Sequence, residues 1–85
     1  MNFDFKVFAG EEIGMKSVWS FGVWQTPPHL TEPLIEIRKT DTFINLNGEV
    51  IQGSMDLNDL VILQNWIKEN KIKIEQLFNG EIEEI

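Results

Sequence analysis

The sequence predicts an α+β domain: an antiparallel sheet of about four to five strands, followed by two C-terminal helices packed on one face of the sheet. Three observations lead to this prediction. Segments of alternating apolar and polar residues fill the first half of the chain, an Asn-Gly pair separates two of them, and apolar residues of the last third recur at helical spacing. With 85 residues, 42% of them hydrophobic, we expect one domain over residues 1–80 and a short acidic tail over 81–85.

The first predicted strand covers residues 1–8, where apolar residues alternate with charged ones. Such a period of two is typical of a half-buried strand with one apolar face. The residues expected on that face are Phe3, Phe5 and Val7. A turn-rich segment with two glycines and two glutamates follows over residues 9–14.

The second predicted strand covers residues 16–25. Alternation puts Trp19, Phe21 and Val23 on one face, which we take as the core face. Trp24 is therefore expected on the opposite face of the sheet.

The third, fourth and fifth strands follow a proline-rich break. The third is expected over residues 33–39, with Ile35 and Ile37 facing the core. Residues 43–46 and 49–52 then form a hairpin around Asn47-Gly48, a pair that suits the two positive-φ positions of a type I′ turn. A two-residue loop would pair Ile44 with Ile51 on the core face.

Two helices are predicted after Gly53. Ser54 or Asp56 can cap the first, which carries apolar residues at helical spacing and is expected to end near Asn70. Those apolar residues are Leu57, Leu60, Val61, Leu63, Trp66 and Ile67. The second helix is expected over residues 71–79, where it carries the apolar residues Ile72, Leu77 and Phe78, with Asn79-Gly80 as its C-terminal signal.

Composition excludes several classes of protein. The absence of cysteine excludes a disulfide scaffold, a cysteine-ligated zinc and a thiol nucleophile, and one histidine excludes a histidine-rich metal site. A net charge of −7 argues against direct nucleic-acid binding, and no apolar run is long enough for a membrane span. We therefore expect a soluble, cytoplasmic protein with no cofactor and no metal.

No group of residues with recognisable catalytic chemistry is found in the sequence, so no catalytic residue is assigned. His29 lacks a companion pattern that would orient it, and the spacing of Asp56 and Asp59 is explained by helix capping. The candidate partner-binding residues are Trp24, Pro27, Pro28 and His29 in an exposed patch, and Glu81, Glu83 and Glu84 in the tail.

Residues 16–80 carry motifs that resemble those of a small bacterial family, the domain of unknown function 4160. The motifs are Pro27-Pro28-His29, the hairpin 48–53 and the helical C-terminus. The chain departs from the family pattern at Thr26, where members have Asn, and at Thr31, where they have a second His. The resemblance implies a small α+β module that contacts a partner, in gene arrangements that look like toxin–antitoxin pairs.

Three functions remain open at this point. The first is a non-catalytic protein-interaction module, one component of such a two-gene pair. The second is an acidic phage or immunity-type inhibitor that covers a basic cleft on its target, as the net charge of −7 suggests. The third is a small hydrolase or nuclease that uses His29. The first strand can also pair across a two-fold axis in a homodimer, or be covered by another segment.

Overall fold

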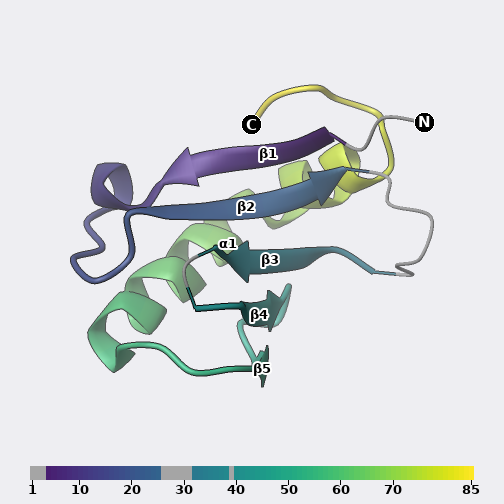
Figure 1. Cartoon of the computed structure of the whole chain (residues 1–85). Helices are drawn as coiled ribbons and strands as arrows, with labels where there is room; N and C mark the ends of the chain where they lie inside the picture. Colours follow the sequence, from purple (N-terminus) through teal and green to yellow (C-terminus); the bar gives the residue numbers. More distant parts are fainter. Residues whose placement is uncertain (1–3, 26–31, 39) are drawn as a thin grey trace.

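The computed structural model describes residues 4–25, 32–38 and 40–85. Five strands form an antiparallel sheet whose spatial order follows the chain (Figure 1). The strands are β1 (Asp4–Ala9), β2 (Ser20–Gln25), β3 (Leu34–Ile37), β4 (Thr42–Asn45) and β5 (Val50–Gln52). The 3₁₀ helix η1 (Gly10–Ile13) follows β1, and the helix α1 (Leu57–Phe78) follows β5. The α+β class and the antiparallel sheet are confirmed.

The prediction of two C-terminal helices is wrong, because α1 is one helix of 22 residues. No proline or glycine interrupts residues 57–78, and Asn70 is accommodated within the helix, where its side-chain amide donates to the carbonyl oxygen of Trp66 at 2.9 Å. The predicted C-terminal signal is confirmed. Gly80 has a φ of 76°, and the N–H of Glu81 donates to the carbonyl oxygen of Gln76 at 2.8 Å, which completes a Schellman motif.

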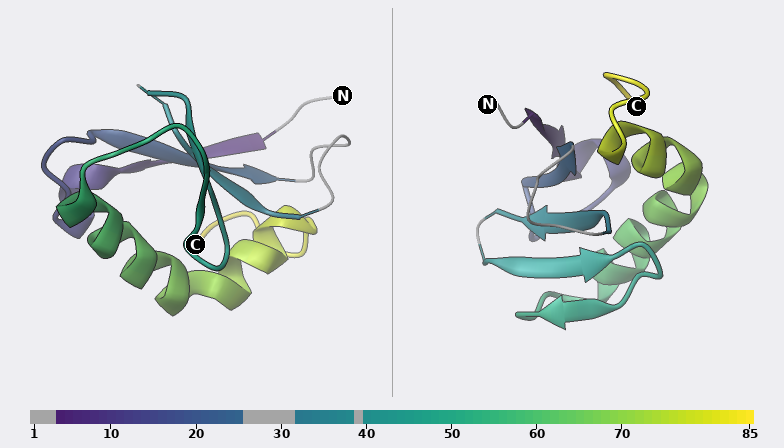
Figure 2. Two further views of the ribbon diagram at one scale, coloured as in Figure 1. Left: turned by 90° about the horizontal axis from the view of Figure 1, so that it is seen from below. Right: turned by 90° about the vertical axis from the view of Figure 1, so that its right-hand side faces the viewer.

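The core lies between α1 and one face of the sheet. Figure 2 shows the helix along a single side of the sheet, and buried aliphatic residues of both elements meet there. The sheet contributes Phe21, Val23, Ile35, Ile37 and Ile44, and the helix contributes Leu63, Ile67, Ile74 and Leu77. The predicted core faces of β2 at Phe21 and Val23 and of β3 at Ile35 and Ile37 are thus confirmed.

Two side chains predicted for the core faces of the first two strands are instead exposed. Val7 of β1 is exposed, and Phe8 packs against the core in its place. The reason is the pairing of Phe8 with Phe21, which brings their rings to 5.5 Å in a stacked arrangement. Trp19 is also exposed, because β2 begins only at Ser20 and its alternation does not extend to Trp19.

The predicted register of the hairpin is wrong by one residue next to the turn, and an irregularity between Phe43 and Ile44 restores it where Phe43 pairs with Gln52. Ile44 pairs with Val50 rather than Ile51, so Ile44 is buried while Ile51 is 52% exposed. The side chain of Asn45 decides the turn, since its Oδ1 accepts from the backbone N–H groups of residues 47 and 49. The N–H of Gly48 donates to the carbonyl oxygen of Asn45 at 3.0 Å, and of the turn residues only Gly48 has a positive φ. This is a three-residue loop closed by a glycine, not a type I′ turn.

Candidate functional site

The predicted patch around Trp24 cannot be placed in the structure. The backbone of Trp24 belongs to β2 and pairs with Phe5 of β1. The side chain of Trp24 is not among the parts of the chain that the structure describes. Residues Pro27, Pro28 and His29 also fall outside the described residues. The patch and any chemical role of His29 stay predictions.

The acidic tail folds back towards β1. Ile82 and Ile85 are partly buried and pack against the core, whereas Glu81, Glu83 and Glu84 are exposed. Residues 83–85 and residues 6–8 of β1 line a common groove of about 300 Å³. The tail therefore lies against the edge strand, and its three glutamates remain exposed.

The outer face of α1 carries aliphatic side chains that sequence analysis assigned to the apolar stripes of the predicted helices. Leu57, Val61 and Ile72 are 75%, 56% and 72% exposed. At 100° per residue these positions fall within one sector of the helix, opposite the buried residues Leu63 and Ile74. The helix thus has an apolar face towards the core and a second, interrupted apolar strip towards the solvent. We call Leu57, Val61 and Ile72 the outer strip.

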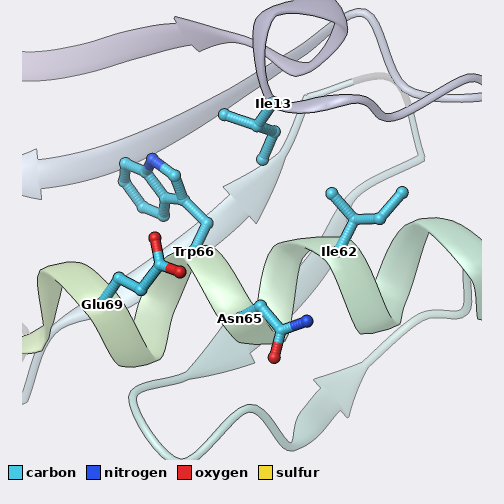
Figure 3. A pocket seen from close by; sticks show the side chains of 5 residues that line it. All are labelled: Ile13, Ile62, Asn65, Trp66 and Glu69. Atoms are coloured by element: carbon cyan, nitrogen blue, oxygen red, sulfur yellow. The ribbon is translucent and has the colours of Figure 1, made fainter.

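A groove opens between η1 and the flank of α1 (Figure 3). Its volume is about 400 Å³, and it is lined by Ile13, Ile62, Asn65, Trp66 and Glu69. Figure 3 shows Ile13 descending from η1 towards the helix, with Ile62 and the Trp66 indole on the helical side of the same space. Glu69, three positions after Trp66 on α1, also lines this space, and Asn65 projects from the helix away from Ile13 in this view. We call this space the η1–α1 groove; sequence analysis did not predict it.

The position of η1 above the helix depends on Gly10. A Cβ at this buried position would overlap the carbonyl oxygen of Val18, so no larger residue fits without a backbone shift. The Gly10 N–H donates to the carbonyl oxygen of Trp19 at 3.1 Å, and its own carbonyl accepts from the N–H of Met15 at 3.0 Å. Close packing of these two backbone segments places Ile13 over the helix.

Asp59 joins the loop after η1 to the first turn of α1. It is 1% exposed, and its carboxylate accepts from the backbone N–H groups of Lys16 at 2.8 Å and Ser17 at 2.7 Å. Asp56 caps the helix, since its carboxylate accepts from the N–H of Asp59 at 3.1 Å. The capping role predicted for Asp56 is confirmed, but Asp59 acts as a tertiary clamp.

The hydrogen bonds to Asp59 also change its acidity. Burial alone raises the pKa of Asp59, because it disfavours the charged form. The two backbone N–H groups, the Ser17 hydroxyl and the charge of Lys16 oppose this effect and outweigh it, so the pKa lies below its ordinary value. The carboxylate is therefore a satisfied structural anion and not a proton donor.

The sheet face away from α1 carries one half-buried carboxylate, Glu36. Burial and the nearby charge of Asp41 raise the pKa of Glu36, and the charge of Arg38 partly opposes them. In the sheet register, Glu36 stands opposite Gly22 and Phe43, and neither of these residues can exchange a proton with it. The charged groups that act on Glu36 are therefore Asp41 and Arg38, and not its two neighbours across the strands.

Within residues 4–25, 32–38 and 40–85, no cluster of three or more His, Asp or Glu side chains is arranged to hold a metal ion. In the same part of the chain, α1 is the one long helix, and it is not apolar enough to span a bilayer.

Comparisons of this chain with protein-family models, with curated proteins and with solved structures gave no match. The resemblance to the domain of unknown function 4160 therefore rests on the motifs of residues 16–80 alone and stays a prediction.

Proposed function

We propose that this protein is a non-catalytic protein-interaction module, and that it forms one component of a bacterial toxin–antitoxin-like pair, as its motif resemblance implies. The outer strip is the observation that carries the proposal. Leu57, Val61 and Ile72 each leave more than half of their surface in water on one helix of a small protein. Apolar groups gathered on one face in this way are typical of a surface that a protein partner covers.

The surroundings of the outer strip suit a protein partner. Lys68 lies between Val61 and Ile72 in the same sector, which also contains the exposed Glu75, and Lys71 lies at its margin. Their aliphatic stems extend the apolar surface, while their charges suit acidic groups at the rim of an interface. The strip is supported from below by the buried side of α1, so the interface would not need to order a flexible segment.

A second candidate function is an acidic inhibitor that blocks a basic cleft. The exposed Glu81, Glu83 and Glu84 favour it, because the packing of Ile82 and Ile85 holds these three carboxylates at one end of the molecule. The two functions differ in their dependence on salt: an apolar interface survives high ionic strength, whereas an interface formed by charge is weakened by it.

The test is affinity capture from a lysate of the source organism at low and high salt, with the bound proteins identified by mass spectrometry. Wild type is compared with Val61→Asp and Ile72→Asp, and with Asn58→Asp as a matched control that adds the same charge at an exposed position on the same helix. We expect one protein to be retained at high salt, lost with the first two variants and kept by the control. A partner lost at high salt, and retained by all three variants, would favour the inhibitor.

A further inference from the structure

We propose that the η1–α1 groove binds an arginine side chain of the protein partner, an inference that rests on the proposed function. The volume of about 400 Å³ lies within the range of about 300–1,000 Å³ that is usual for ligand sites. Its walls expose polar and apolar surface in similar amounts: Ile13, Ile62 and Trp66 supply the apolar side chains, and Asn65 and Glu69 the polar ones. Such a site fits a long side chain with an apolar stem and a polar end.

The walls of the groove are held in place before any ligand binds. The indole of Trp66 packs at 5.1 Å from the ring of Phe8 and at 5.0 Å from the ring of Phe21. Ile13 is positioned by η1, whose attachment depends on the close approach of Gly10 to Val18. Because these groups do not have to be ordered on binding, little entropy is lost at the groove.

The polar groups of the groove indicate a positively charged ligand. Glu69 supplies a carboxylate on the same wall of the groove as Trp66, and it has no ion-pair partner among the described residues. The exposed Glu11 and Glu12 precede Ile13 on η1 and add negative charge to this element. Lys73 lies four positions after Glu69 on the same flank of α1, and it is not among the residues that line the groove.

The geometry favours arginine over other cations. A guanidinium is planar, so it can stack on an aromatic ring while it donates to a carboxylate. Trp66 and Glu69 are three positions apart on α1, which makes them neighbours on the helix surface, and both line the groove. The side-chain oxygen of Asn65 can accept a further N–H at the outer margin. The three methylenes of arginine would lie against Ile13 and Ile62.

The experiment is a titration with N-acetyl-arginine amide, followed by ¹H–¹⁵N NMR of the backbone and of the Trp66 indole N–H. A single side chain at an open groove is expected to bind with a dissociation constant of about 1 mM or weaker. Glu69→Gln should weaken binding at least threefold, while Glu75→Gln, an exposed glutamate of the same helix outside the groove, should leave it unchanged. Thermal unfolding of both variants confirms that they are folded.

Two further probes separate charge from shape. N-acetyl-citrulline amide, which has the same length without the charge, should not shift the groove resonances, and N-acetyl-lysine amide should bind more weakly than the arginine probe. Equal binding of the citrulline probe, equal or tighter binding of the lysine probe, or equal effects of Glu69→Gln and Glu75→Gln would each overturn the inference.

The two proposals can fail separately. If N-acetyl-arginine amide binds the groove while every captured protein is retained by Val61→Asp and Ile72→Asp, the proposed interface is wrong and the arginine site stands. If capture depends on the outer strip but no arginine probe shifts Trp66, only the inference about the groove is wrong.

Discussion

The two sides of α1 carry the same kinds of side chain in very different surroundings. Leu63 and Ile74 on the inner side are fully buried against the sheet, whereas Leu57 and Ile72 on the outer side are largely exposed. Leucine and isoleucine occur on both sides, so residue type does not distinguish them. The comparison teaches that the inner side accounts for the fold, and that the outer side is available for a partner.

The largest expected effect is on stability from the inner side. Leu63→Ala should lower the free energy of unfolding by about 3 kcal/mol, because it removes buried apolar surface and leaves a cavity. Leu57→Ala, the same change at a position 75% exposed, should cost less than about 0.5 kcal/mol. Urea denaturation of the two variants makes the comparison, and similar losses would show that both sides are packed in solution.

A smaller effect is expected at Asp59, where the inner side meets the loop after η1. Asp59→Asn should lower stability by about 2 kcal/mol at neutral pH, because a charged acceptor of two backbone N–H groups is replaced by a neutral one.

The contribution of Asp59 should also depend on pH with a defined sign. Its pKa in the folded protein lies below the unfolded value of about 3.9, so its stabilisation is complete above that pH and is lost as the pH falls through the lower folded value. Thermal unfolding between pH 7 and pH 2 should show wild type approaching Asp59→Asn in acid. Curves that stay parallel throughout would contradict the assignment.

At the helix terminus the expected effect is smaller again. Asp56→Ala removes the cap of the Asp59 N–H and should cost about 1 kcal/mol. Asp56→Asn, which keeps a capping oxygen, should retain most of that stability in the same urea experiment. Equal losses in both variants would mean that Asp56 acts through its charge and not as a cap.

The smallest expected effect on stability comes from charges on the outer strip. Val61→Asp and Ile72→Asp should each change the free energy of unfolding by no more than about 0.5 kcal/mol, since both side chains are exposed. Thermal unfolding measures this change. A large loss would mean that the outer strip packs against part of the molecule, which would remove the basis of the proposed interface.

Local patterns predicted much of the sheet and both helix signals. Alternation identified the core positions of β2 and β3, and Asp56 and Gly80 stand where the helix begins and ends. The predicted turn of the hairpin was wrong, because two local signals compete there. Asn47-Gly48 suggested a type I′ turn, but the side chain of Asn45 organises a longer loop, and that shift turns Ile51 out of the core.

The η1–α1 groove and the outer strip could not be predicted from local patterns. Ile13 and Trp66 are 53 positions apart in the chain, and they line one space only because Gly10 and Asp59 hold the η1 region against the helix. The glycine at position 10 is visible in the sequence. It did not reveal the close approach to Val18, because glycine is also expected in any turn-rich segment.

The sequence by itself determined the α+β class, the order of strands before helix and the chemistry of the helix caps, because these depend on residues close together in the chain. Tertiary structure decided which apolar residues are buried. The single sheet covers one side of a helix that has apolar residues on two sides, so Leu63 and Ile74 enter the core while Leu57, Val61 and Ile72 remain in contact with water. That choice depends on contacts between distant segments, which periodicity along the chain does not record.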